Sequence, residues 1–172
     1  THGHKLISAS ASEGTLGRDH LIQLLDLVEE TDYVYILETN GMTLGDDPSL
    51  ARALVKYKQL HVRVSIKGTD PDMFHELTGA HRPAYELPFV GLRNLIDSGV
   101  SCNACLMVSF SDKKGVADAK QKLLQIHPGL LKSLELESIT MFPKVAERLK
   151  QHNLRPTSIQ RSGRIQMIDV TQ

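Results

Sequence analysis

Short apolar stretches alternate along this chain with segments whose apolar residues recur at helical spacing. The strand-like stretches are rich in aliphatic, β-branched and aromatic residues, and they occupy residues 6–7, 33–37, 61–66, 102–109 and 134–139. Each is followed by a segment with helical periodicity. Repeated strand–helix units form parallel sheets with right-handed crossovers. The sequence therefore predicts an α/β fold in which about five βα units share one parallel sheet.

Two of the predicted helices begin with the same signature. Asp47-Pro48 and Asp70-Pro71 each place Asp at the N-cap and Pro at the first helical position. A longer helix is predicted over residues 84–98, where Gly99 ends it, and further helices over 116–126 and 143–152.

The predicted strands do not have two equivalent faces. In the third strand, His61 and Arg63 alternate with Val62 and Val64. Because neighbouring residues of a strand point to opposite faces, one face of the sheet is apolar and the other polar. This pattern favours an open barrel over a doubly wound sheet that is buried on both sides.

Composition narrows the class of protein. The 172 residues include 41% hydrophobic residues, 20 Lys and Arg and 20 Asp and Glu, so the formal net charge is zero. A neutral chain argues against nucleic acid or anionic lipid as the main partner. The two cysteines indicate a reducing compartment, and no apolar run is long enough for a membrane span. We therefore expect a cytoplasmic protein without a membrane partner. Residues 1–153 are predicted to form the barrel domain, and residues 154–172 a tail with one short strand near 164–170.

Polar residues gather directly after the predicted strands, where the active sites of βα folds form. The positions that follow the five strands in turn are Ser12 and Glu13; Glu38, Thr39, Asn40 and Gly41; Ser65, Lys67 and Gly68; Ser109 and Asp112; and Thr140, Met141 and Phe142. Carboxylates there can bind an ammonium group, a lysine can bind a carboxylate, and short polar side chains can bind ribose hydroxyls. By spacing alone, the same residues also fit solvated loops.

Two segments point to a known family. The segments ETNG at residues 38–41 and VSIKGTDPDMFHELTGA at residues 64–80 resemble the radical S-adenosylmethionine (radical SAM) superfamily, most closely the pyruvate formate-lyase (glycyl-radical) activating enzymes. The resemblance covers residues 6–112 well and weakens beyond them. It implies a partial parallel (β/α) barrel that binds S-adenosylmethionine at a [4Fe–4S] cluster and cleaves it reductively to a 5′-deoxyadenosyl radical.

The resemblance also implies a ligand site. Glu13 lies in a segment similar to the family's GGEP loop, whose glutamate and backbone hold the methionine ammonium group, and Glu38 matches a second acidic residue near that group. Asn40 lies in the turn that follows. Ser65 takes the place of an aspartate and offers a hydroxyl instead, and Lys67 matches the lysine that meets the methionine carboxylate. The GGEP-like loop departs from the pattern, because a serine replaces one glycine and Gly14 replaces the proline.

The family's cluster motif, C-x3-C-x2-C, is not in this sequence. Only Cys102 and Cys105 are present, and they lie after the ETNG turn, whereas the family's cluster loop precedes the GGEP segment. We therefore expect the cluster ligands and the first of six βα units to lie upstream of Thr1, and the chain as given to be inactive. The two cysteines could form half a zinc site or a redox pair, but opposite strand faces favour two inert thiols.

Several partners and alternatives follow from this interpretation. The radical's target would be a glycyl-radical enzyme, a small molecule or an RNA base, and an electron donor such as flavodoxin or ferredoxin would reduce the cluster. Without its first unit, the strand near residues 5–8 would expose an edge through which chains self-associate. One alternative is a non-catalytic βα domain that binds S-adenosylmethionine or a nucleotide without a cluster. Another is a partial-barrel enzyme that uses no radical.

Overall fold

The computed structural model describes residues 5–9, 13–161 and 164–167. Its strands are β1 (Leu6–Ser8), β2 (Val34–Thr39), β3 (Leu60–Lys67), β4 (Cys102–Met107), β5 (Glu135–Glu137), β6 (Ile139–Thr140), β7 (Ser158–Arg161) and β8 (Arg164–Met167). Its helices are α1 (Arg18–Glu29), α2 (Met42–Asp46), α3 (Pro48–Leu54), α4 (Pro71–Thr78), α5 (Leu87–Asp97), α6 (Lys113–Ile126), α7 (Gly129–Lys132) and α8 (Pro143–Gln151), with short 3-10 turns η1 (Gly14–Leu16) and η2 (Arg82–Glu86). No helix within these described ranges is long and apolar enough to cross a bilayer.

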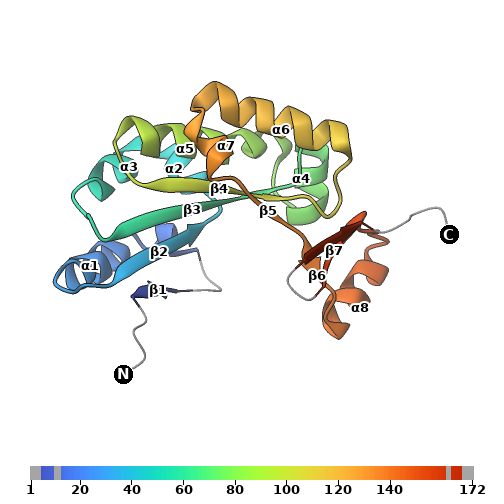
Figure 1. The fold of residues 1–172 in the computed structure, drawn as a ribbon, viewed down its shortest axis with the longest axis horizontal. Coiled ribbons are helices and arrows are strands. Elements are labelled where there is room, and N and C mark those ends of the chain that lie inside the picture. The colour runs from blue at the N-terminus through green and yellow to red at the C-terminus, as the bar shows by residue number, and fades with distance from the viewer. Residues whose placement is uncertain (1–4, 10–12, 162–163, 168–172) are drawn as a thin grey trace.

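Five strands form one parallel sheet in the order β1-β2-β3-β4-β5. The sheet is curled, and helices cover its convex face while the concave face stays open (Figure 1). This arrangement is a half-barrel of parallel βα units. The predicted α/β class and the five parallel strands are therefore confirmed.

The convex face of the sheet supplies the hydrophobic core. In β3, Val62, Val64 and Ile66 are fully buried, and they pack with helix residues such as Leu25 of α1 and Leu92 of α5. Burying one aliphatic side chain of this size stabilises the fold by roughly 1.5–3 kcal/mol. The alternation read from the sequence thus places the apolar residues of β3 under the helices and leaves its polar residues on the concave face.

The predicted helix starts are present. Asp47 accepts a hydrogen bond from the backbone N–H of Ser49 at 2.8 Å, and Asp70 accepts one from Met73 at 2.8 Å, so each caps a helix whose first residue is proline. The helix predicted over residues 84–98 is instead a 3-10 turn followed by α5, because Pro88 sits one residue inside the start of α5.

Helix α2 is an element that the sequence pattern did not predict. It begins after Gly41, which has a φ of +74°, and it lies against α5 at very short range. A Cβ on Gly91 would stand 2.7 Å from the Gly41 carbonyl oxygen, and one on Gly45 would overlap the carbonyl oxygen of Leu87. Glycine at these positions therefore lets the two helices meet and fixes the turn that follows β2.

Beyond β5 the chain leaves the barrel sheet and forms a small unit of its own. Strands β6 and β7 pair in parallel, β7 and β8 pair antiparallel, and α8 lies beside them (Figure 1). We call residues 139–161 and 164–167 the C-terminal unit. The single strand predicted over residues 134–139 is thus divided between two sheets. The predicted short strand near 164–170 is present as β8, and its last positions lie outside the described residues. The domain limits 1–153 and 154–172 stay a prediction.

Candidate functional site

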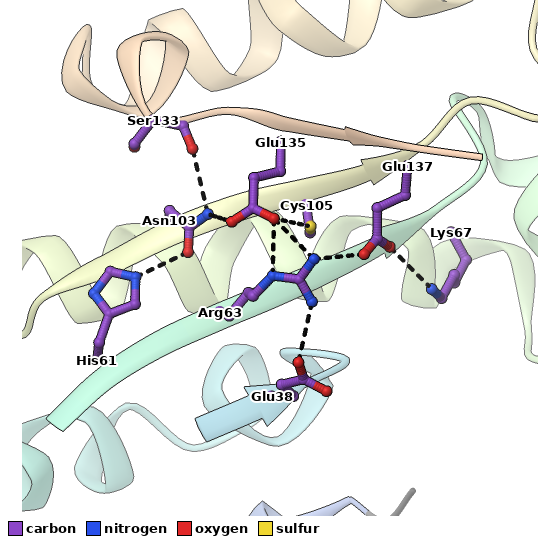
Figure 2. Close-up of polar contacts among 9 residues, drawn as sticks. All are labelled: Glu38, His61, Arg63, Lys67, Asn103, Cys105, Ser133, Glu135 and Glu137. Atoms are coloured by element: carbon purple, nitrogen blue, oxygen red, sulfur yellow. Dashed lines mark hydrogen bonds and ion pairs between the residues drawn. The ribbon is translucent and has the colours of Figure 1, made fainter. Parts of the chain in front are cut away.

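The concave face of the barrel carries an ionic network centred on Arg63. The guanidinium of Arg63 contacts Glu38 on β2 at 3.3 Å, Glu135 on β5 at 2.9 Å and Glu137 on β5 at 2.5 Å (Figure 2). Because β5 is two strands away from β3, these contacts require the curl of the sheet. One side chain on the central strand thereby links β2 to β5 across the open face.

Charge and hydrogen bonding reinforce each other in this network. The pKa of Arg63 is raised, mainly because its guanidinium donates hydrogen bonds to Glu135. The pKa of Glu135 is lowered below its ordinary value of 4.5, first because it accepts those bonds. Both groups are therefore charged at neutral pH, and the concave face is a polar surface held in one arrangement.

Lys67, a predicted site residue, ends β3 at the rim of this face. Its Nζ lies 3.9 Å from Oε2 of Glu137, which is beyond hydrogen-bond distance (Figure 2). This partner was not predicted from the sequence. Glu135 and Glu137 alternate with Leu134 and Leu136 in the sequence, and that period of two is the signal that places both carboxylates on the polar face.

Glu38 and Ser65, two further predicted residues, share the same face. Glu38 uses Oε1 to bind Arg63, and its side chain remains 41% exposed. Ser65 stands in register with Cys105 of β4, two residues before Lys67, and is partly buried. The structure therefore brings Glu38, Ser65 and Lys67 onto the concave face near the carboxyl ends of their strands.

Glu13 and Asn40 lie at the end of β2. Glu13 accepts hydrogen bonds from Thr39 Oγ1 at 2.7 Å, from Thr15 Oγ1 at 2.6 Å and from the Asn40 backbone N–H at 2.7 Å. The Asn40 side chain in turn accepts from the Met42 N–H at 2.9 Å, which holds the start of α2. Both residues line a cleft of about 530 Å³ together with Leu16, Met42, Thr43, Asp46 and Leu87. Ser12, predicted beside Glu13, lies outside the described residues.

The five predicted residues thus form two neighbouring groups. Glu13 and Asn40 line the cleft after β2, while Glu38, Ser65 and Lys67 lie on the concave face. Both groups belong to the carboxyl side of adjacent strands.

The two cysteines lie on different faces of β4. Cys102 packs against the core, whereas Cys105 is on the concave face with its thiol 3.6 Å from Glu135. Burial raises the pKa of Cys102 to about 11 and raises that of Cys105 as well. Both are free thiols, protonated at neutral pH. Within residues 5–9, 13–161 and 164–167, no three His, Cys, Asp or Glu side chains are grouped to hold a metal ion.

Comparison with solved structures identifies the fold. No protein-family model matches the sequence, and no curated protein matches it. SuiB of Streptococcus suis, solved bound to S-adenosylmethionine, is similar over 87% of this chain with a TM-score of 0.63 and 15% identity. Native anSMEcpe, solved with bound AdoMet, is similar over 80% of this chain with a TM-score of 0.59 and 19% identity.

These likenesses concern part of the larger proteins. The matched region is 36% of the SuiB chain and 38% of the anSMEcpe chain, so this sequence spans well under half of either. At these identities the match shows the fold. The predicted fold class, α/β with a partial parallel (β/α) barrel, is confirmed.

Proposed function

We propose that this chain is the S-adenosylmethionine-binding portion of a radical SAM enzyme. The observation that carries the proposal is the half-barrel whose polar concave face and strand ends hold Glu13, Glu38, Asn40, Ser65 and Lys67. The fold is shared with proteins solved with S-adenosylmethionine bound. In the intact enzyme the cofactor would be cleaved reductively to a 5′-deoxyadenosyl radical.

The donors and acceptors present fit the methionine end of that cofactor. An ionised carboxylate has about four acceptor sites. Oε1 of Glu13 already accepts from Thr15 and Thr39, but among the described residues Oε2 accepts only from Asn40, so it retains room for an ammonium N–H. The second oxygen of Glu38 offers another acceptor.

Lys67 fits the carboxylate of the same ligand. Its 3.9 Å contact with Glu137 is an ion pair without a hydrogen bond, so within the described part of the chain its three N–H groups remain available. A ligand carboxylate would accept from Lys67, and Ser65 and Asn40 would bind ribose hydroxyls. These residues bind and orient the cofactor.

The chain's own residues do not fit a [4Fe–4S] cluster. Such a cluster needs three protein thiolates in this family, whereas the two cysteines here are protonated and lie on opposite faces of β4. We propose that the cluster ligands belong to sequence other than residues 1–172 and that the chain as given is inactive. We further propose that the intact enzyme has an activating-enzyme role toward a glycyl-radical enzyme or acts on a small molecule. We also propose that flavodoxin or ferredoxin reduces its cluster and that it is cytoplasmic.

The absence of a fit between the two cysteines and a cluster also favours a second candidate function. A domain without three converging thiolates could bind S-adenosylmethionine without cleaving it. Sequencing the reading frame upstream of Thr1 separates the two candidates, because only the first requires a C-x3-C-x2-C motif there. Anaerobic reconstitution of that longer protein, followed by detection of 5′-deoxyadenosine, then tests cleavage directly.

Binding can be tested on the chain itself by NMR titration with S-adenosylmethionine. A few charge-assisted hydrogen bonds, less ordering costs, predict a dissociation constant of roughly 1 mM. Lys67→Ala should weaken binding by about tenfold or more, because a carboxylate loses its charged partner. Lys132→Ala, which removes an exposed lysine on α7, is the matched control and should leave affinity unchanged. Equal affinity of the Lys67 and Lys132 variants would remove Lys67 from the site.

A further inference from the structure

The chain has no net charge, but its basic and acidic residues are unevenly distributed along the sequence. Within residues 139–167 there are six basic residues, Lys144, Arg148, Lys150, Arg155, Arg161 and Arg164, and one acidic residue, Glu147. The rest of the chain holds fourteen basic and nineteen acidic residues. The C-terminal unit is therefore strongly basic and the barrel is acidic. Figure 1 shows α8 set apart from the helices that cover the barrel.

The basic side chains of α8 are available to a partner. Lys144, Arg148 and Lys150 are exposed, as is Arg155 just beyond the helix. Every ion pair among the described residues lies between residues 18 and 137, so none of these four takes part in one. The barrel neutralises many of its charges internally, whereas these four side chains of the C-terminal unit face solvent.

Two positions at the start of α8, and one pair of like charges along it, are unfavourable for the helix itself. Phe142 occupies the N-cap without a side-chain cap bond, where Ser, Thr, Asp or Asn would stabilise the helix. Lys144 lies in the first turn, where the helix dipole disfavours a cation. Lys144 and Arg148 are a like-charged pair four residues apart, about 6 Å along the helix axis. Arg148 and Lys150 suit the last turn, but the dipole explains neither Lys144 nor Phe142.

Phe142, Lys144 and Arg148 are residue types that together can bind a single-stranded nucleic acid. Phosphates bind Lys and Arg, and unpaired bases stack on exposed aromatic rings. Phe142 is 63% exposed and stands two residues before Lys144 in the chain. An exposed ring close in the chain to two exposed cations, four residues apart on one helix, is the composition of such a surface.

Other partners fit this surface less well. Protein interfaces are depleted in charge at their centres, whereas this surface is mostly charge. A helix that inserts into a membrane needs a free apolar face. Here Leu149 is buried and Val145 is partly buried, so the apolar face of α8 is already covered.

We propose that the C-terminal unit binds an unpaired segment of RNA, with phosphates on Lys144 and Arg148 and a base stacked on Phe142. RNA is favoured over DNA because unpaired loops and ends are where proteins chiefly meet exposed bases in RNA. None of these three residues is among the five proposed to bind S-adenosylmethionine, so the proposal does not depend on that binding.

Fluorescence anisotropy of the full chain with a labelled oligouridine tests the proposal. If three or four of the exposed cations Lys144, Arg148, Lys150 and Arg155 contact phosphates, the slope of log affinity against log salt is about −2 to −3, since each contact contributes about −0.7 on single strands. The double variant Lys144→Gln/Arg148→Gln should bind at least about tenfold more weakly at low salt and lose about 1.4 of that slope. Arg93→Gln/Lys132→Gln removes the same charge from exposed helix positions on the barrel, and it should bind within about twofold of the parent.

The aromatic contact is tested separately. Phe142→Ala should weaken binding by about fivefold or more with the salt slope unchanged, because stacking releases no counterions, and Phe142→Tyr should restore it. Circular dichroism should show both sets of variants folded, since neither removes a buried group. Lys67→Ala should bind RNA as the parent does, which keeps this test distinct from that of the cofactor site.

Several results would overturn the proposal. These are no binding to oligouridine at low salt, an equal loss in the Arg93/Lys132 control, or equal binding of the matching DNA or of duplex RNA. Binding of vesicles that contain phosphatidylserine, with the same dependence on Lys144 and Arg148 and without RNA binding, would assign the surface to a membrane instead.

Discussion

The two faces of β3 differ sharply, although they share one backbone. Val62, Val64 and Ile66 are fully buried under the helices, while Arg63 and Lys67 alternate with them in sequence and face the open side. The apolar face exchanges solvent contact for packing and supplies stability. The polar face keeps charged groups in a fixed arrangement and supplies chemistry. Because successive side chains of a strand point to opposite faces, one segment can both stabilise the fold and present charged groups.

The largest effect is expected on the packed face. Ile66→Ala should lower the free energy of unfolding by about 2–5 kcal/mol, because it removes buried methyl groups and leaves a cavity in a core that relaxes only partly. Urea denaturation followed by circular dichroism measures this loss. A change below about 1 kcal/mol would mean that the helices do not pack on β3 as described.

An intermediate effect is expected at the centre of the polar face. Arg63→Met roughly keeps the volume but removes the guanidinium that Glu38, Glu135 and Glu137 share, and only Glu137 keeps another cation nearby, Lys67 at 3.9 Å. Breaking a fully buried pair costs about 3–5 kcal/mol, and because the Arg63 side chain is 22% exposed we expect about 1–3 kcal/mol. Arg93→Met on the exposed face of α5 is the control and should change stability by less than about 0.5 kcal/mol.

The pH dependence of the stability difference between the parent and Arg63→Met identifies the cause of that difference. The pKa of Glu135 is lowered in the folded state, so its contribution is complete above its usual value of 4.5 and is lost as the pH falls through the lower folded value. In the Arg63→Met variant Glu135 loses the cation that lowers its pKa. The stability difference between parent and variant should therefore narrow below pH 4.5. A difference that is constant with pH would instead indicate lost packing of the arginine stem.

The sequence predicted this division of the sheet because alternation is a local signal. The five strands, the caps Asp47 and Asp70, and the polar character of His61 and Arg63 can all be read from neighbouring residues. Helix α2 cannot, because it is five residues long, contains Gly45 and depends on contact with α5. The division between β5 and β6 likewise depends on pairing of Ile139 with Ile159, twenty residues away.

As with the fold, the sequence predicted the local features of the candidate site but not its long-range contacts. Lys67 and Glu38 could be placed near strand ends, because parallel strands align their carboxyl ends. Their link through Arg63 and Glu137 could not, since it depends on the curl that brings β5 over β3. The hydrogen bonds from Thr39 and Asn40 to Glu13 also join segments that only the pairing of β1 with β2 brings together.

The smallest effect on stability is expected at Ser65, directly before Ile66, where the largest effect is expected. Ser65→Ala should change the free energy of unfolding by less than about 0.5 kcal/mol, because Ser65 lies on the open face beside Ile66 and removing its hydroxyl leaves no large cavity. Under the proposed function it should still weaken S-adenosylmethionine binding by about two- to tenfold, the worth of one neutral hydrogen bond. Urea denaturation and NMR titration of the same preparation measure both quantities. A stability loss close to that of Ile66→Ala would contradict the distinction between the faces. An unchanged affinity would leave that distinction intact and place the ligand away from Ser65.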